Sequence, residues 1–372
     1  MFSKRAQWNA ATNRLTLARL SYRGPLFDLT NANPTKAGLS YPLDELADVM
    51  SRAARAPYDP QPLGIVSARE AVARELSCDA SDIVITASTS EAYSFLFKLL
   101  CDPGDAVLTA KPSYPLLEHL AALELIGLRY FALEFHKRWE IDPARISDAL
   151  TDRTRAILVV NPNNPTSSYV SANEQDAIAR FGLPVISDEV FHPFPFDKRA
   201  PSFVRGDVVT FTLGGLSKSA GLPHYKLGWI RVSGPGKAAA IEGLELIADN
   251  FLSVATPVQV ALPELLAIAP RIREAIRGRT SSNLATLKTA LENYPAARVL
   301  PVEGGWSAVI RVPRIDSDEA LALRLIEEHG VVVHPGYFFD FETDGHLVVS
   351  LLTEDGIFEE GIARLISSLP RP

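Results

Sequence analysis

Short β-branched, apolar runs alternate with helix-like stretches from about residue 82 onward, and this alternation constrains the fold more than any other feature. The helix-like stretches cover 90–101, 114–126 and 171–181. The strand-like runs cover 82–87, 106–110, 128–135, 155–160, 184–188, 208–213 and 228–233. Alternation of this kind is typical of an α/β sheet that is largely parallel and has helices on both faces.

The chain changes character after residue 236, where it becomes mostly helical. Strand-like runs return at 306–312, 330–335 and 346–352, separated by helix-like segments near 317–329 and 354–369. This second pattern predicts a smaller α/β domain, completed in part by the irregular N-terminal segment. We therefore expect three parts: an N-terminal arm that contributes to the small domain, a large domain and a C-terminal small domain, with bounds 1–40, 41–275 and 276–372.

Composition narrows the class of protein. The 372 residues are 47% hydrophobic and 22% charged, which is ordinary for a soluble globular protein of about two domains. The net charge of −7, without a dense Lys/Arg run, argues against nucleic-acid binding. No apolar run is long enough to span a bilayer, and the first ten residues lack the apolar core of a signal peptide. Cys78 and Cys101 match no metal or disulfide spacing, so we expect reduced thiols, a cytoplasmic location and no metal.

Polar residues follow several of the predicted strands, at the sheet edge where open α/β folds bind ligands. Residues 88–92, "STSEA", open a helix and could bind an anion such as phosphate, although taken alone an ordinary N-cap is the better explanation. Tyr114 could stack on a planar ligand or simply occupy a turn. Asn164, in the stiff turn "NPNNPT", could donate to a ligand oxygen or form an Asx-turn.

Two charged residues end or follow the strand-like runs at 184–188 and 208–213. Asp188 directly ends a buried strand, so it requires a cationic partner, which a structural salt bridge or a ligand could supply. Lys218 follows the strand at 208–213 in "GGLSKSAGLPHYKLGW". A partly desolvated lysine there has a lowered pKa and can form a Schiff base with a carbonyl. The alternative is an exposed loop lysine without a chemical role.

A single cofactor would use the residue types found at all five strand ends. Pyridoxal 5′-phosphate (PLP) requires a lysine for its aldehyde, a carboxylate for its pyridine nitrogen, an aromatic ring over its own ring and donors for its phosphate. The coincidence of these residue types favours a PLP site over five separate structural explanations.

The sequence resembles the fold type I PLP enzymes, specifically the class I/II aminotransferases of the aspartate aminotransferase superfamily. The resemblance covers nearly the whole chain, through "LTNANP" (29–34), "YDPQPLGIVSAREAVA" (58–73), "TSEA", "PSYP", "NNPT", "SDEVF" and "SKSAGLPHYKLGW". It implies a large PLP-binding domain with a mostly parallel seven-stranded sheet flanked by helices, plus a smaller α/β domain. The roles it implies are the aldimine lysine for Lys218, the pyridinium partner for Asp188, the 3′-oxygen donor for Asn164, ring stacking for Tyr114, phosphate binding for Thr89, Ser90 and Glu91, phosphate binding across subunits for Tyr58 and a substrate contact for Ala32.

The chain departs from the family pattern at several positions near the cofactor. Lys226 stands where relatives have a phosphate-binding arginine, and a lysine lacks the bidentate fork of a guanidinium. Gly215 replaces a Ser or Thr phosphate donor, Phe191 replaces a tyrosine that contacts the 3′-oxygen, and Ser167 replaces a glycine.

The position that relatives use for the substrate carboxylate also differs. Their C-terminal arginine, in a pattern like "LRISLAT", corresponds to Val348 in "HLVVSLLT". A carboxylate in a desolvated site needs a cationic or multi-donor partner. Either another residue supplies the charge, with Lys36 as our candidate, or the substrate is not an ordinary α-amino acid.

The resemblance implies an aminotransferase that moves an amino group from an amino acid to a 2-oxo acid by a ping-pong scheme. A PLP lyase of the same fold acting at Cβ, and a binding protein without turnover, remain open alternatives. The resemblance of Tyr58 and of residues 250–259 to segments that reach across subunits also implies a homodimer with shared active sites.

Overall fold

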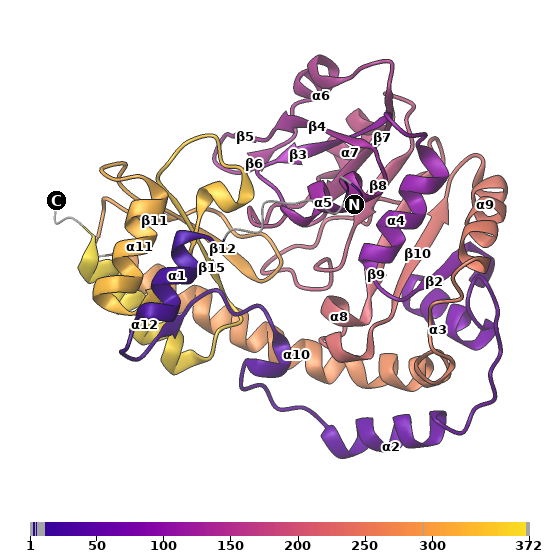
Figure 1. Cartoon of the computed structure of the whole chain (residues 1–372), viewed down its shortest axis with the longest axis horizontal. Coiled ribbons are helices and arrows are strands. Elements are labelled where there is room, and N and C mark those ends of the chain that lie inside the picture. The colour runs from indigo at the N-terminus through magenta and orange to yellow at the C-terminus, as the bar shows by residue number, and fades with distance from the viewer. Residues whose placement is uncertain (1–2, 4, 6–11, 293, 370–372) are drawn as a thin grey trace.

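A computed structural model describes residues 3, 5, 12–292 and 294–369, and it has a large and a small lobe (Figure 1). The large lobe is built on a seven-stranded sheet with the strand order β2-β10-β9-β8-β7-β3-β4. Only β10 (Gly228–Ser233) runs antiparallel to its neighbours. The expected mostly parallel, seven-stranded sheet is therefore confirmed. The other strands are β2 (Ile83–Thr86), β3 (Ala106–Lys111), β4 (Gly127–Ala132), β7 (Thr154–Val160), β8 (Val185–Asp188) and β9 (Thr210–Gly215).

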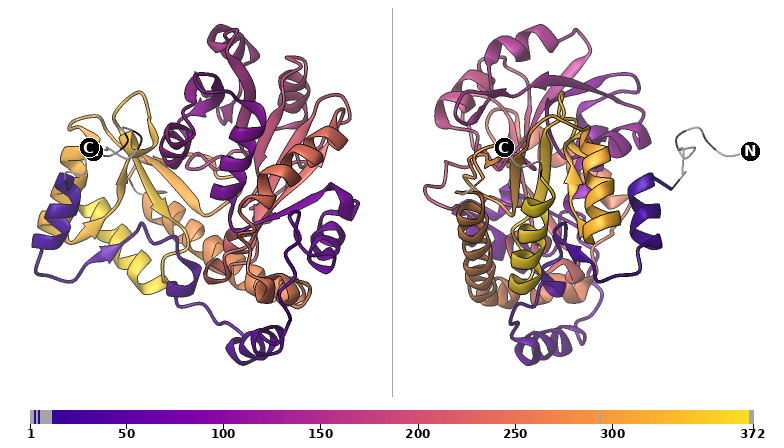
Figure 2. Two further views of the ribbon diagram at one scale, coloured as in Figure 1. Left: turned by 45° about the vertical axis from the view of Figure 1, so that its right-hand side comes forward. Right: turned by 90° about the vertical axis from the view of Figure 1, so that its left-hand side faces the viewer.

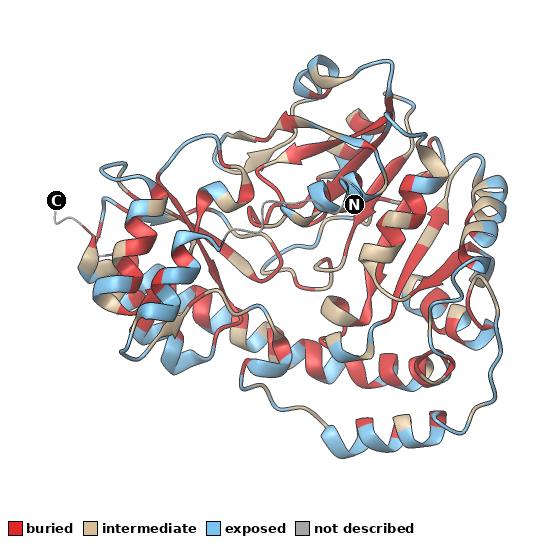
Figure 3. Cartoon of the chain, in the orientation of Figure 1, coloured by how far each residue is buried: buried red, intermediate tan, exposed pale blue. Residues whose placement is uncertain are grey.

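Helices bury both faces of this sheet, as the strands' nearly continuous apolar runs require. One face packs on α4 (Thr89–Leu100), α5 (Leu116–Leu123) and α9 (Lys237–Asp249). The other face packs on α3 (Val66–Leu76), α6 (Pro143–Ala149), α7 (Ala172–Ala179) and the first half of α10 (Thr256–Glu292). Figure 3 shows the central strands almost wholly buried between these layers.

The small lobe contains a four-stranded antiparallel sheet, in the order β11-β12-β15-β14, covered by α11 (Asp318–His329) and α12 (Asp355–Ser368). Its strands are β11 (Arg298–Val299), β12 (Ser307–Arg311), β15 (His346–Ser350) and β14 (His334–Pro335). The N-terminal segment joins this lobe: α1 (Arg14–Ser21) packs on α11, and β1 (Phe27–Asp28) pairs in parallel with β13 (Val331–Val332) (Figure 2).

Helix α10 belongs to both lobes. Its residues from Val258 to Ile276 pack in the core beneath α3, while Leu284, Leu287 and Leu291 pack in the core of the small lobe. The domain boundary expected at 275/276 therefore falls inside one continuous helix. Helix α2 (Leu43–Ala53) lies along the outside of α10, with its outer side exposed (Figure 3).

Two expected strands are split in the structure. The run 128–135 divides into β4 and β5 (Glu134–Phe135), because β5 leaves the sheet to form a hairpin with β6 (Trp139–Glu140). The run 330–335 divides into β13 and β14, because its first half pairs with the N-terminal segment and its second half with β15. Among the described residues, none of the helices combines the length and hydrophobicity that crossing a bilayer requires.

Candidate active site

A cavity of about 410 Å³ opens at the carboxyl ends of the parallel strands. The sequence predicted polar residues at this edge of the sheet. Residues far apart in the chain line it together: Ala32, Ser88, Thr89, Ser90, Tyr93, Tyr114, Asn164, Asp188, Phe191, Gly215, Ser217, Lys218 and Lys226, with apolar residues between them.

Lys218 enters the cavity from the short helix α8 (Leu216–Ser219), directly after β9. The backbone is fixed there because Leu216 N–H donates to Leu227 O at 2.9 Å. A Cβ on Gly215 would lie 3.0 Å from both Leu227 O and Gly228 Cα, so a serine or threonine here would require the neighbouring backbone to shift. The Lys218 ammonium lies 3.5 Å from Ala32 O and 5.4 Å from the centre of the Trp306 ring. Burial lowers the pKa of the Lys218 amine.

Asp188 is buried at the end of β8, with 8% of its surface exposed. Its two carboxylate oxygens accept one hydrogen bond each, from Tyr93 Oη at 2.6 Å and from Val190 N–H at 3.1 Å. Burial raises the pKa of this carboxyl, and the bond from Tyr93 partly offsets the rise. No lysine, arginine or histidine forms an ion pair with Asp188 among the residues that the structure describes.

The N-terminus of α4 forms one end of the cavity. Ser88 caps the helix by accepting from Glu91 N–H, which leaves the first-turn amides of Thr89 and Ser90 without an intrahelical acceptor. Gly228 allows this approach, since a Cβ there would lie 2.9 Å from Ser88 C and 3.0 Å from Thr89 N. Ser217 and Lys226 line the cavity as well, so hydroxyl, amide and ammonium donors are available for an anion.

Glu91 does not join this set of donors. Its carboxylate accepts from Ala87 N–H at 2.6 Å and from Ser253 Oγ at 2.8 Å, and the side chain does not line the cavity. A carboxylate cannot donate to phosphate, so the expected phosphate role of Glu91 is corrected to a structural one.

Tyr114, Asn164 and Phe191 line the same cavity. Asn164 Oδ1 accepts from Ser307 Oγ at 3.3 Å, which leaves its amide NH₂ to donate elsewhere. The Phe191 ring packs edge-on against Trp306, with 5.1 Å between ring centres.

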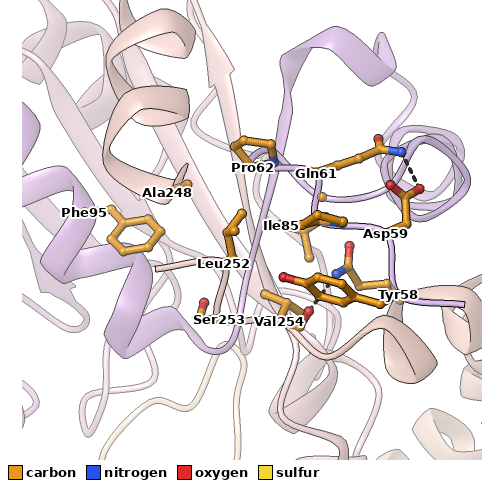
Figure 4. Close-up of a pocket in the computed structure, with 13 residues that line it drawn as sticks. Tyr58, Asp59, Gln61, Pro62, Ile85, Phe95, Ala248, Leu252, Ser253 and Val254 are labelled. Carbon is orange, nitrogen blue, oxygen red and sulfur yellow. Dashed lines mark hydrogen bonds between the residues drawn. The ribbon is translucent and has the colours of Figure 1, made fainter. Parts of the chain in front are cut away.

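Two other expected site residues, besides Glu91, lie outside the cavity. Lys36 is an exposed residue of a short 3₁₀ helix, and its carbonyl accepts from Asn31 Nδ2. Tyr58 is 74% exposed. Figure 4 shows Tyr58 at a separate, small pocket that Leu252, Ser253 and Val254 also line.

Sequence reasoning missed Tyr93 and Ser217. Tyr93 lies four residues after Thr89 on α4, so both side chains fall on one face of the helix, and this spacing is the signal that could have identified it. Ser217 directly precedes Lys218 in the sequence, but nothing in the motif separates it from an ordinary loop serine.

The cavity fits PLP on grounds that are independent of any resemblance. A buried carboxylate without a cationic partner is costly, and a protonated pyridine nitrogen would supply the missing positive charge. Lys218, with its lowered pKa, is a suitable nucleophile for an aldehyde. The donors at the start of α4 suit a phosphate.

Residues 31–364 match the sequence profile of the aminotransferase class I and II family. The chain belongs to this family. Its members use PLP and transfer amino groups, so the protein is a PLP-dependent transaminase. This assignment favours transamination over the Cβ elimination and the non-catalytic role that the sequence alone left open.

The individual proteins to which the chain is similar are also aminotransferases. The alanine aminotransferase of Mycobacterium tuberculosis is 28% identical over 353 residues, which cover 89% of this chain and 82% of that protein. The human tyrosine aminotransferase is 26% identical over 310 residues, covering 78% and 68% of the two chains. Among solved structures, an alanine aminotransferase from Pyrococcus furiosus superposes with a TM-score of 0.89 at 23% identity, covering 99% of each chain, and so shows the same fold.

Proposed function

We propose that Lys218 binds the cofactor covalently and carries the proton during transamination, and that Asp188 pairs with the cofactor's ring nitrogen. The observation that carries this proposal is the cavity that Lys218 and Asp188 line together, each without an ion-pair partner among the described residues. A lysine and a carboxylate that share a desolvated cavity would ordinarily pair with each other or with other charges. Their unpaired state suits a ligand that engages both.

The lowered pKa of Lys218 suits its second role. Burial lowers the pKa of the Lys218 amine and so favours its neutral form, which would accept the proton from the donor's reacting carbon. The bound cofactor supplies an electron-withdrawing ring that stabilises the negative charge left on that carbon. Asp188 holds the ring nitrogen in its protonated form, and the Tyr93 hydroxyl fixes the orientation of the carboxylate.

The remaining residues hold the cofactor in place. Thr89, Ser90, Ser217 and Lys226 bind the phosphate, Asn164 donates to the 3′-oxygen and Tyr114 covers the ring. Phe191 stands where relatives have a tyrosine that contacts the 3′-oxygen. Because phenylalanine cannot donate a hydrogen bond, Asn164 would make this contact without that second donor. Ala32 closes the substrate side, where its carbonyl already contacts the Lys218 ammonium.

We also propose that the active unit is a homodimer, with Tyr58 reaching the phosphate of the other subunit. Tyr58, Leu246 and Phe251 are 74%, 71% and 53% exposed, and the segments that carry them line two neighbouring pockets on the large lobe. Large apolar side chains exposed in this way are typical of an interface. A cytoplasmic location is consistent with the two free cysteines, Cys78 and Cys101.

The experiment is reductive labelling. Borohydride should fix the cofactor to the purified protein, and peptide mapping should find the label on Lys218. Lys218→Ala should abolish amino transfer and leave the fold intact, because among the described residues the side chain makes a single weak hydrogen bond, at 3.5 Å. A label on another lysine, or a fully active Lys218→Ala protein, would contradict the proposal.

A further inference from the structure

The charges around the cavity bear on the kind of donor that it accepts. Among the described residues that line it, Lys218 and Lys226 are the only ones with cationic side chains. Under the proposed function, on which this inference rests, Lys218 serves the cofactor's aldehyde and Lys226 its phosphate. Among the described residues of this subunit, no lining cation remains for a carboxylate on the reacting carbon of the substrate.

The candidates for such a partner lie elsewhere or are occupied. Lys36 is exposed and does not line the cavity. Arg279, which bonds to Ala37 O at 2.6 Å, forms an ion pair with Asp355 at 2.8 Å. Arg138 forms an ion pair with Glu303 at 2.8 Å.

At the position where the sequence lacks an arginine, the small lobe has a buried apolar residue, Val348, which does not line the cavity. Val348 is 2% exposed and lies opposite Val309 and His334 in the sheet. It packs in a cluster with Leu300, Phe339 and Phe341. Burial lowers the pKa of His334, so this imidazole is a poor source of positive charge at neutral pH.

The bound cofactor makes the electrostatics less favourable for another anion. Its phosphate brings about two negative charges, and Asp188 adds one. The ring nitrogen, Lys226 and the N-terminus of α4 offset these charges and leave no surplus of positive charge. The rest of the lining is largely apolar, with Leu116, Leu120 and Pro223 among its residues.

We infer that one of the two substrate pairs of this transaminase has no carboxylate on the reacting carbon: a primary amine or an ω-amino acid, and the corresponding aldehyde or ketone. In that half-reaction the carbon–nitrogen bond of the donor breaks and its carbon loses two electrons. Water supplies the carbonyl oxygen, and the cofactor keeps the amino group and the two electrons. The second substrate, a carbonyl compound, then takes both.

Two matched pairs of donors test this inference on the holoenzyme. Reductive labelling of one sample first shows the cofactor on Lys218. In an unreduced sample, the cofactor's absorbance is then followed in single-turnover reactions with 4-aminobutyrate and L-2-aminobutyrate, and with 2-phenylethylamine and L-phenylalanine. In at least one pair, the donor without a carboxylate on the reacting carbon should react at least tenfold more efficiently. Equal rates or a faster α-amino acid in both pairs, or no reaction from either donor that lacks a carboxylate on the reacting carbon, would overturn the inference. Absence of the label would instead contradict the proposed function.

An equilibrium measurement separates binding from turnover. 2-Methylalanine and tert-butylamine have no hydrogen on the reacting carbon, so they bind without transferring their amino group. After correction for the fraction of neutral amine, tert-butylamine should bind at least tenfold more tightly by absorbance titration. Equal or tighter binding of 2-methylalanine would overturn the inference.

Lys36→Met supplies the matched variant. Because Lys36 lies outside the cavity, this change should leave the KM for every donor unaltered. A rise of more than tenfold in the KM for α-amino acids, with the cofactor's spectrum unchanged, would identify a carboxylate partner and overturn the inference.

Discussion

Replacing Asp188 with asparagine should change the stability of the protein in opposite directions with and without its cofactor. In the cofactor-free protein, Asp188 is a buried carboxylate held by two neutral donors, Tyr93 and Val190. Asparagine keeps the shape and both contacts, since its oxygen can accept from Val190 N–H while its NH₂ group donates to the Tyr93 oxygen. It removes the charge that burial disfavours.

The size of the effect follows from opposing contributions. Burying a carboxylate costs several kcal/mol, and two charge-assisted hydrogen bonds return about 1.5–3 kcal/mol each. The raised pKa shows that the balance still disfavours the charge, so Asp188→Asn should stabilise the cofactor-free protein by on the order of 1 kcal/mol. With PLP bound, the same change removes one partner of a buried ion pair. That loss costs about 3–5 kcal/mol, which corresponds to at least about 100-fold weaker cofactor binding.

The difference between the two proteins should depend on pH. The folded-state pKa of Asp188 lies above its unfolded value of about 3.9. Its contribution to stability is therefore fully present below the unfolded pKa and is lost as the pH rises through the folded pKa. The stabilisation by asparagine in the cofactor-free protein should be absent at acid pH and should grow as the pH rises.

Thermal unfolding with and without PLP, at several pH values, measures both effects. Glu189→Gln is the matched control, because Glu189 is the adjacent buried carboxylate and does not line the cavity. Its oxygens accept from Asn161, Ser187, Ser202 and Phe203, so loss of the charge should lower the Tm of the cofactor-free protein without altering PLP affinity. A cofactor-free Asp188→Asn protein that melts below wild type at pH 8 would refute the reasoning.

Two further predictions concern the phosphate. Lys226→Met should weaken PLP binding about 10- to 100-fold, because it removes a hydrogen bond between charged groups worth about 1.5–3 kcal/mol. Lys226→Arg should restore it, and titration of the cofactor-free protein showing no difference between the two variants would contradict the role of Lys226. Tyr58→Phe should weaken PLP retention by a similar amount in the dimer, again through the loss of one such bond, and a fully active monomer in size-exclusion chromatography at assay concentration would exclude contact across subunits.

The sequence predicted those elements of the fold that depend on the local pattern of apolar and polar residues. The runs that became β3, β7, β8 and β9 are buried on both faces, so they stand out as continuous apolar segments. The division of 128–135 into β4 and β5 was not visible, because pairing with β6 is decided by the fold and not by the composition of the run. The pairing of β13 with the N-terminal strand β1 could not be predicted for the same reason.

The candidate site was predictable where the fold alone sets the direction of a side chain. Asp188 and Lys218 follow strands, so the carboxyl edge of the sheet brings them to one cavity. Glu91 was assigned from its place in a motif, but its side chain turns back to Ala87. Lys36 was assigned from its place after the N-terminal strand, but a short helix after Asn33 leaves it exposed and outside the cavity.

The pairing of β1 with β13 has a consequence for how the protein forms during synthesis. Phe27 and Asp28 find their strand partners at Val331 and Val332, about 300 residues later. A ribosome adds about 5–20 residues per second, so β1 emerges about 15–60 s before its partner exists. Through that interval Leu29, which the finished protein buries completely, lacks its cover. The large lobe can fold first, but the small lobe can close only when translation is nearly complete, and until then the N-terminal segment is a natural target for chaperones.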